Sequence, residues 1–424
     1  MNREDGAMRQ GATGALGQIK RTGGGLGSRL ARCVSAAALA MGMLAASPVF
    51  ALDGIVEKKT FEMPSLTTTG GATIKNVRVG WESYGKLNDA KDNVILLTHF
   101  FSGSSHAAGK YKAEDAAPGY WDSIVGPGKP LDTDKYFIIS SDTLVNLSAK
   151  DPTVITTGPA SINPDTGKPY GLTFPVVTIR DFVNVQKGLL DSLGVTGVQA
   201  VMGGSMGSLQ ALEWGVAYPE MVKRVIAVIG GAEADPFLIG WLNLWAAPIK
   251  LDPNWNNGDY YGKTEPKAGL TEALKLVTLH ARHWKWADAA FGRKWAEEGK
   301  DPRAALGNQY AIEAWLDKAA AGRAAVSDAN HFLYLVKASQ TYVMGNGASL
   351  EEGLAKLKAP TLLIPSADDM VFPPERGMRP LKDRLEKQGV AVEYTDAITS
   401  TLGHLDGVAN IAKAGDSIAK FLAK

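Results

Sequence analysis

The residues best suited to do chemistry in this chain of 424 residues surround Ser205. Residues 203–207 read Gly-Gly-Ser-Met-Gly, after a short apolar run at 198–202 and before apolar residues at helical spacing from Leu209. This order predicts a strand, a sharp turn and a helix. A serine in such a turn has a strained backbone and needs small neighbours, and its hydroxyl is presented as a nucleophile. The arrangement predicts attack on an acyl carbonyl.

A serine hydroxyl is a poor nucleophile at neutral pH, so an imidazole must accept its proton and a carboxylate must orient the imidazole. Of six histidines, His404 is the one that follows the last predicted strand. Two adjacent aspartates, Asp368 and Asp369, lie in the loop after a buried strand at 360–365. We prefer Asp369 as the acid and keep Asp368 as the alternative, since a loop aspartate often caps a turn. The order Ser, Asp, His along the chain is that of α/β-hydrolases.

The loop after a predicted strand at 93–98 reads His-Phe-Phe-Ser-Gly at 99–103. In an α/β-hydrolase this loop donates one backbone N–H to the oxyanion hole, and the residue after the nucleophile donates the other. We therefore assign these two donors to Phe101 and Met206. We expect His99 to be a hydrogen-bonded structural histidine that shapes the turn.

Strands and helices that position these residues alternate along the chain. Strands are predicted at 55–63, 74–81, 93–98, 136–140, 198–202, 224–229, 360–365 and 390–394, and helices at 178–193, 209–218, 328–342, 375–388 and 408–422. The first strands alternate in polarity, whereas the later ones are continuous apolar runs, typical of a parallel sheet covered on both faces. The predicted fold class is α/β: an α/β-hydrolase fold with a mostly parallel central sheet, helices on both faces and an inserted helical lid.

Residues 234–352 differ in composition from the rest of the chain, because they contain seven of its ten tryptophans and read as helices. We predict a lid at 234–352 between two parts of the hydrolase core, 52–233 and 353–424. The tryptophans are candidates for the lining of an acyl pocket, and the alternative is that most of them pack the lid onto the core. His280 and His283 are three residues apart without a visible third ligand, so no metal site is predicted.

Residues 1–51 have the pattern of an export signal. A basic region precedes an apolar stretch at 34–49, and Val-Phe-Ala at 49–51 predicts cleavage after Ala51. The basic region is long, which makes Met8 an alternative start of translation. An uncleaved membrane anchor is the rival interpretation, although about 16 apolar residues are short for a span. The single cysteine, Cys33, lies in this segment. The predicted location is periplasmic or secreted.

The chain that remains after such a cleavage has 39 basic and 42 acidic residues and no cysteine. That balance gives no indication of a nucleic-acid partner or of binding to a membrane surface. The composition is that of a globular protein with a substantial core. No metal or organic cofactor is predicted, and the expected partner is a small-molecule ester or acyl donor.

Longer motifs resemble one known family. They are Pro118-Gly-Tyr-Trp-Asp122, Gly126-Pro-Gly-Lys129, Leu131-Asp-Thr-Asp134, Thr157-Gly-Pro-Ala-Ser-Ile-Asn-Pro164, Gly167-Lys-Pro-Tyr-Gly171, Phe174-Pro-Val-Val-Thr-Ile-Arg-Asp181, Gly203-Gly-Ser-Met-Gly207 and Gln210-Ala-Leu-Glu-Trp214. Together with 252–262 and 328–335 they make the chain similar to the homoserine O-acetyltransferase family of α/β-hydrolases. The resemblance implies Ser205 as nucleophile, Asp369 as acid and His404 as base, and a homodimer through the lid helices.

The substrate pocket departs from that resemblance at three positions. Leu405 follows His404 where enzymes of the family that act on homoserine usually have an aspartate for the substrate's amino group. Leu274, beside Lys275, occupies the position of an arginine for the substrate's carboxylate, and Ser102 replaces a threonine. A site without these charges binds a zwitterion poorly, because such recognition depends on charge-assisted hydrogen bonds. We therefore expect a divergent substrate pocket.

The sequence leads to an exported serine esterase or acyl hydrolase that works through an acyl-Ser205 intermediate. Export favours hydrolysis, since acetyl-CoA is expected to be scarce outside the cytoplasm. The first alternative is an O-acyltransferase of the homoserine O-acetyltransferase type with an acyl-CoA donor. The second is a catalytically silent binding protein with an α/β-hydrolase fold.

Overall fold

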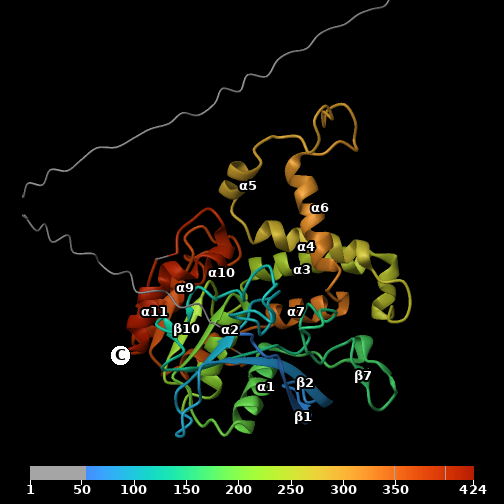
Figure 1. Cartoon of the computed structure of the whole chain (residues 1–424). Coiled ribbons are helices and arrows are strands. Elements are labelled where there is room, and N and C mark those ends of the chain that lie inside the picture. The colour runs from blue at the N-terminus through green and yellow to red at the C-terminus, as the bar shows by residue number, and fades with distance from the viewer. Residues whose placement is uncertain (1–53, 348, 397) are drawn as a thin grey trace, which may run out of the picture. The chain divides into compact units, whose positions relative to one another are not determined.

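An eight-stranded sheet lies at the centre of the unit Pro48–Lys424 (Figure 1). This computed structural model describes residues 54–347, 349–396 and 398–424. The predicted export signal at 1–51, its cleavage site and Cys33 lie outside the described residues. Within the described ranges, no helix is long and apolar enough to cross a membrane.

The sheet is mostly parallel. Its strands are β1 (Lys59–Thr67), β2 (Thr73–Tyr84), β6 (Phe137–Ser141), β3 (Val94–Thr98), β9 (Ala200–Gly204), β10 (Val225–Val228), β11 (Thr361–Ile364) and β12 (Val392–Tyr394), in that spatial order. The β1–β2 and β2–β6 pairs are antiparallel, and the other pairs from β6 to β12 are parallel. Two short pairs lie outside this sheet, β4 (Val125–Gly126) with β5 (Leu131–Asp132) and β7 (Ile162–Asn163) with β8 (Lys168–Pro169).

Both faces of the sheet are covered, which explains the continuous apolar runs of the parallel strands. In β3, Val94 and Leu96 belong to one buried cluster, and Ile95 and Leu97 belong to another. Side chains alternate between the faces of a strand, so each face has its own core. The first core contains residues of α1 (Ile179–Ser192), α2 (Met206–Ala217) and α9 (Met378–Lys387), and the second contains residues of α11 (Gly415–Leu422). The predicted fold class is confirmed.

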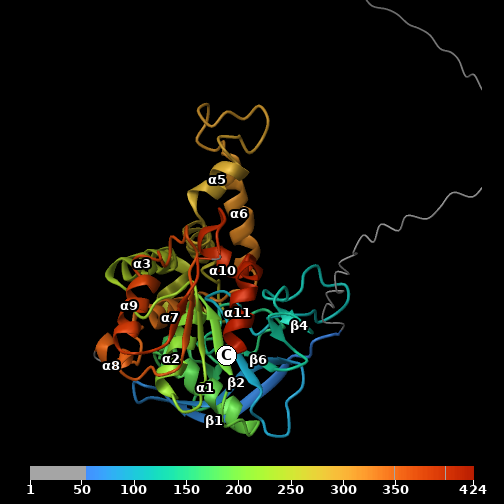
Figure 2. The same ribbon diagram turned by 90° about the vertical axis from the view of Figure 1, so that its left-hand side faces the viewer.

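The segment between β10 and β11 is helical. It contains α3 (Pro236–Leu251), α4 (Lys267–His280), α5 (Trp284–Ala290), α6 (Ala311–Ala324), α7 (Ala329–Gln340) and α8 (Leu350–Leu354). Helix α3 contacts α4 and α7, and α4 contacts α6. Figure 2 shows α5 and α6 extending away from the sheet. We call residues 234–352 the helical segment; its bounds as a lid stay a prediction.

The C-terminal helix that we expected at 408–422 is not continuous. The structure has α10 (Asp406–Ala409), a 3-10 turn η4 (Ile411–Ala414) and then α11. Asn410 interrupts them with φ −117° and ψ 20°, and its amide donates to Asp406 Oδ1 at 2.6 Å. A side chain that bonds to the preceding turn competes with helix formation, and periodicity alone does not detect it.

A buried carboxylate in β2 joins the sheet to the loop that follows β3. Glu82 is fully buried, and it accepts hydrogen bonds or a salt bridge from Lys58, Tyr84, Ser105, His106 and Tyr111 at distances of 2.6–3.1 Å. Burial by itself raises the pKa of Glu82, but the bond from His106, the charge of Lys58 and the Tyr111 hydroxyl outweigh it and lower the pKa to about 2. The ionised form of Glu82 is therefore part of the folded state.

We expect Glu82→Gln to lower the free energy of unfolding by about 3 kcal/mol at neutral pH. A carboxyl whose pKa falls on folding adds stability above its unfolded pKa, near 4.5, and loses that contribution as the pH falls toward 2. The difference between wild type and variant should therefore shrink between pH 5 and pH 3, measured by urea unfolding. Glu62→Gln, which removes an exposed partner of Arg78, is the control and should cost about 0.5 kcal/mol or less. A difference that is independent of pH would contradict this prediction.

Candidate active site

Ser205 lies in the turn between β9 and α2, with a backbone conformation of φ 57° and ψ −122°. A residue other than glycine in this region is strained, and such strain clusters at functional sites. Neighbouring glycines make the turn feasible. A Cβ on Gly203 would lie 2.1 Å from the Thr98 Oγ1, and one on Gly207 would lie 2.0 Å from the Thr98 carbonyl oxygen. The elbow can thus approach the end of β3 only with glycine at these two positions.

We expect Gly207→Ala to destabilise the protein by about 3 kcal/mol, because the added methyl group overlaps a backbone oxygen of β3 that cannot move independently. The stability to urea and the reactivity of Ser205 toward p-nitrophenyl acetate should both fall, since relief of the clash displaces the start of α2. Gly240→Ala in α3 is the matched control. A Cβ there meets no atom within 4 Å, so the change should be neutral or stabilising by up to about 1 kcal/mol. Equal stability of the two variants would contradict the argument.

The structure brings Ser205 and His404 together although they lie 199 positions apart in the sequence. His404 Nε2 lies 2.7 Å from Ser205 Oγ, and its Nδ1 lies 2.8 Å from Asp369 Oδ2. All three residues are buried. With the proton on Nδ1 and directed at the carboxylate, the lone pair of Nε2 faces the serine hydroxyl, which is the tautomer that can accept a proton from serine.

The two candidate aspartates have different partners. The side chain of Asp369 is fully buried; its Oδ2 faces His404, and its Oδ1 accepts hydrogen bonds from the N–H groups of Val371 and Phe372 at 2.8 and 2.9 Å. Asp368 is partly exposed and forms a salt bridge to Lys285 of α5 at 3.0 Å. The geometry therefore places Asp369 beside His404, while Asp368 ties the loop after β11 to the helical segment.

Phe101 and Met206 lie next to Ser205 on the wall of one cavity. Met206 is the first residue of α2, so its N–H has no acceptor within the helix. Among the described residues, neither the Met206 N–H nor the Phe101 N–H donates a hydrogen bond to another protein group. Both N–H groups are thus free for an oxygen atom of a bound molecule.

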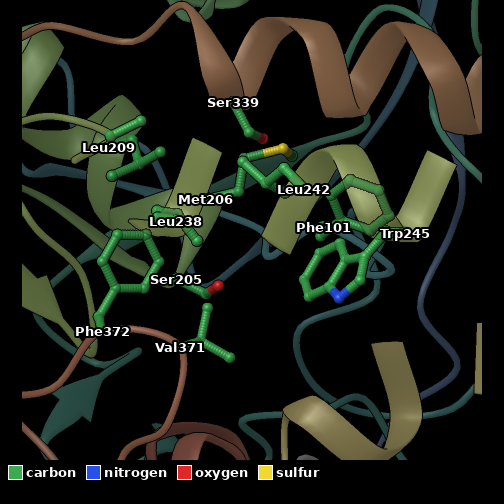
Figure 3. A pocket seen from close by; sticks show the side chains of 11 residues that line it. Phe101, Ser205, Met206, Leu209, Leu238, Leu242, Trp245, Ser339, Val371 and Phe372 are labelled. Atoms are coloured by element: carbon green, nitrogen blue, oxygen red, sulfur yellow. The ribbon is translucent and has the colours of Figure 1, made fainter. Parts of the chain in front are cut away.

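The cavity at Ser205 is apolar. Its volume is about 390 Å³, including space open to solvent, and it is lined by Phe101, Ser205, Met206, Leu209, Ala234, Leu238, Leu242, Trp245, Ser339, Val371 and Phe372. Figure 3 shows Leu238 and Val371 close around the Ser205 hydroxyl, with Trp245 further along the wall. None of these eleven residues carries a charge. Such a lining suits a small uncharged acyl group.

The sequence did not single out most of this wall. Leu238 and Leu242 come from α3, Ser339 from α7, and Val371 and Phe372 from the loop that carries Asp369. Of the seven tryptophans in the helical segment, Trp245 is the one that lines the cavity. The apolar pattern of α3 was the available signal, but periodicity does not tell which neighbour a helix faces.

The positions that depart from the family pattern lie outside this lining. Leu274 of α4 is buried in the hydrophobic core of the protein. Lys275 forms salt bridges with Glu272 of α4 and Asp317 of α6. Leu405 is half-buried next to His404, and its N–H donates to the Ala281 carbonyl at 3.3 Å. Ser102 is half-buried and is not part of the wall.

His280 has a structural contact with the acid loop. Its Nε2 lies 3.1 Å from the Met370 carbonyl oxygen, and its ring stacks on Trp241 with centroids 4.2 Å apart. Burial lowers the pKa of His280 to about 4, so its ring is neutral at neutral pH. His283 instead accepts from the Lys285 N–H at the start of α5. Among the described residues, no group of three or more His, Cys, Asp or Glu is arranged to hold a metal ion.

Comparisons with known proteins agree with this fold. The family model of the α/β hydrolase fold matches residues 113–396. The structure of esterase E22 superposes with a TM-score of 0.82 and 51% identity over 87% of this chain and all of that one. A homoserine O-acetyltransferase from Bacillus anthracis superposes with a TM-score of 0.83 and 36% identity over 88% and 98% of the two chains. The protein is therefore an enzyme of the α/β-hydrolase class.

Sequence relatives define the family within that class. A homoserine O-acetyltransferase of Carboxydothermus hydrogenoformans is 37% identical over 373 residues, which are 87% of this chain and 96% of the relative. One from Methanococcoides burtonii is 39% identical over 335 residues, 79% of this chain and 67% of the relative. The chain belongs to the homoserine O-acetyltransferase family, and the predicted resemblance is confirmed.

Proposed function

We propose that this protein is an exported serine esterase that acts on esters of small acyl groups through an acyl-Ser205 intermediate. The observation that carries the proposal is the uncharged lining of the cavity at Ser205. A zwitterionic acceptor such as homoserine would leave its ammonium and carboxylate unpaired there, which is costly. The 51% identity to a protein named an esterase, against 36–41% to proteins named homoserine O-acetyltransferases, supports the same choice.

In this mechanism Ser205 Oγ attacks the ester carbonyl carbon while its proton passes to His404 Nε2. The carbonyl oxygen becomes an oxyanion that receives hydrogen bonds from the N–H groups of Phe101 and Met206. The C–O bond to the alcohol then breaks, and His404 returns the proton to the leaving alkoxide. Asp369 stabilises the imidazolium without taking its proton.

The acyl-Ser205 ester is resolved in the second half of the reaction by a water molecule. His404 accepts one proton of the water as its oxygen attacks, and a second oxyanion forms at the same two N–H groups. Collapse of this intermediate returns the proton to Ser205 Oγ and releases the carboxylic acid. A transferase would differ in this half alone, because an acceptor hydroxyl would replace the water.

An O-acyltransferase is the second candidate, favoured by the names of the sequence relatives. The test is p-nitrophenyl acetate turnover by residues 52–424, with and without homoserine and CoA. Steady turnover that neither compound changes would support the esterase. A burst followed by stalling, relieved by homoserine, would overturn the esterase in favour of the transferase. The absence of both burst and turnover with this and longer esters would indicate a silent fold.

Export and assembly complete the proposal. We propose cleavage after Ala51 and release into the periplasm or the medium. Sequencing the N-terminus of the native protein tests this, and a native protein that still contains residues 34–49 would contradict it.

We also propose a homodimer through the helical segment, where Trp284, Trp295 and Leu306 are exposed. Exposed apolar side chains gathered on one segment are typical of an association surface. Light scattering after size exclusion would reveal a monomer if this is wrong.

We expect Leu405→Asp to make homoserine an acceptor. A carboxylate next to His404 would supply the missing counter-charge for an ammonium group, whereas the cavity lining still offers no cation for the carboxylate of homoserine. The acceleration of deacylation by homoserine should therefore be modest, about 5- to 10-fold. It is measured as p-nitrophenol release together with O-acetylhomoserine formation. Leu405→Asn is the uncharged control, and an equal acceleration in both variants would refute the role of charge.

A further inference from the structure

The turn that carries the Phe101 N–H is held by a buried histidine. His99 Nδ1 lies 2.8 Å from the Phe100 carbonyl oxygen, so Nδ1–H donates to it. The Gly103 N–H donates to the same oxygen at 2.9 Å and closes the turn. Both lone pairs of the Phe100 oxygen are thereby used, and the carbonyl has one fixed direction.

That direction determines where the Phe101 N–H points. The Phe100 carbonyl and the Phe101 N–H belong to one peptide plane, and in a trans peptide they point in opposite directions. A group that fixes the carbonyl therefore fixes the N–H on the other side of the plane. Phe101 lines the cavity together with Ser205 and Met206, so the direction of its N–H bears on the candidate site.

The tautomer of His99 is itself determined by Asn146. The Asn146 side-chain amide lies 3.3 Å from His99 Nε2 and donates to the Gly103 carbonyl at 3.0 Å. An amide N–H can only donate, so Nε2 must be the acceptor and Nδ1 must carry the proton. Burial lowers the pKa of His99, which keeps the ring neutral and in this form.

A histidine of the helical segment holds Asn146 in place. His331 of α7 donates from Nδ1 to the backbone carbonyl of Asn146 at 2.8 Å, and His331 Nε2 accepts from the Ala160 N–H at 3.2 Å. A continuous series of buried hydrogen bonds thus runs from α7 through Asn146 and His99 to the peptide of Phe101. None of these side chains lines the cavity, so any effect that they have on the reaction is indirect.

We infer that His99 and Asn146 are positioning residues of the oxyanion hole: together they hold the Phe100–Phe101 peptide so that the Phe101 N–H meets the oxyanion. The inference rests on the proposed function, because it needs the Phe101 N–H as a donor. A donor that is oriented before the reaction stabilises the transition state without reorganisation, whereas it contributes little to the binding of the ester itself. Loss of either side chain should therefore lower kcat and leave KM almost unchanged.

The test uses two substitutions at one position in residues 52–424. His99→Leu matches the volume of histidine and removes the donor, and His99→Asn is smaller but returns an N–H near the position of Nδ1. We expect His99→Leu to lower kcat for p-nitrophenyl acetate by about 10- to 100-fold with KM within about 3-fold. The Gly103 N–H, which still holds the carbonyl, limits the loss. His99→Asn should recover most of the activity despite its smaller volume.

A tetrahedral probe separates positioning from packing. Methylboronic acid forms a B–O bond with Ser205 Oγ, whose proton passes to His404, and one boronate oxygen then occupies the oxyanion position. Its inhibition constant should rise in His99→Leu by the same factor by which kcat falls. Asn146→Ala should lower kcat by about 10-fold, and the double variant should be no worse than His99→Leu, because Asn146 acts on the Phe100 carbonyl through His99.

Three outcomes would overturn the inference. One is a folded His99→Leu protein with wild-type kcat and boronate affinity, and another is His99→Asn as impaired as His99→Leu, which would indicate packing. The third is additive losses in the double variant. If His99→Leu does not fold, Asn146→Ala takes its place, and a wild-type boronate affinity of that variant would overturn the inference.

Ser205→Ala separates a failure of the proposed function from a failure of this inference. An active Ser205→Ala refutes the proposed function, whereas an inactive Ser205→Ala beside a normal His99→Leu refutes this inference alone.

Discussion

Ser205→Ala is expected to lower kcat/KM for p-nitrophenyl acetate by about 10⁵-fold or more. The Ser205 hydroxyl lines the cavity and lies 2.7 Å from His404 Nε2, and no acyl-Ser205 intermediate can form without it. Removal of a catalytic serine leaves only the contribution of substrate binding and the oxyanion donors. The measurement is the steady-state rate of p-nitrophenol release, with intact-protein mass spectrometry to detect the acyl-enzyme in the wild type.

Ser208→Ala is the matched control, three residues further along α2. Ser208 is fully buried, and among the described residues its Oγ has no hydrogen-bond partner. Replacing an unpaired buried hydroxyl by a methyl group is neutral or stabilising, so activity should stay within about 3-fold of wild type. Ser205→Ala with substantial activity and no acyl-enzyme in the wild type would refute the proposed mechanism.

Asp369→Asn is expected to lower kcat by about 10⁴-fold, the second large effect. The Oδ1 position accepts hydrogen bonds from Val371 and Phe372, so the amide oxygen would occupy it and the NH₂ group would face His404. His404 Nδ1 would then have to accept, which moves its proton to Nε2. A histidine in that tautomer cannot take the proton of Ser205. The loss should appear in kcat, with little change in stability, measured by thermal unfolding.

The neighbouring aspartate provides the control. Asp368→Asn weakens the partly exposed salt bridge to Lys285 and a 4.0 Å contact with His283 Nε2, so activity should change by no more than about 3-fold. A larger loss in Asp368→Asn than in Asp369→Asn would reverse the assignment of the acid. The pair also tests the choice that the sequence left open between two adjacent residues of one type.

Much of the fold could be predicted because its signals are local. The alternation of β2, the apolar runs of β3, β9 and β11 and the glycines around Ser205 are properties of short segments, set by the geometry of strands and by the space that a turn leaves. Each of these elements is present in the structure within a few residues of the prediction. The prediction of one continuous helix at 408–422 was wrong, because the Asn410 side chain donates a hydrogen bond to Asp406 in the preceding turn.

The candidate site also has a part that local sequence signals predict and a part that only tertiary contacts determine. The sequence by itself determined that a serine elbow, an acid loop and a late histidine exist in the order of an α/β-hydrolase, since each is encoded within a few residues. Only the tertiary structure decided that Asp369, and not Asp368, faces His404, that α3 contributes to the cavity wall, and that Asn146 contacts His99 at the turn before Phe101. The hydrogen bonds and the ion pair among them join residues 35 to 83 positions apart in the sequence. Their geometry follows from the packing of whole elements, which residue type and spacing do not contain.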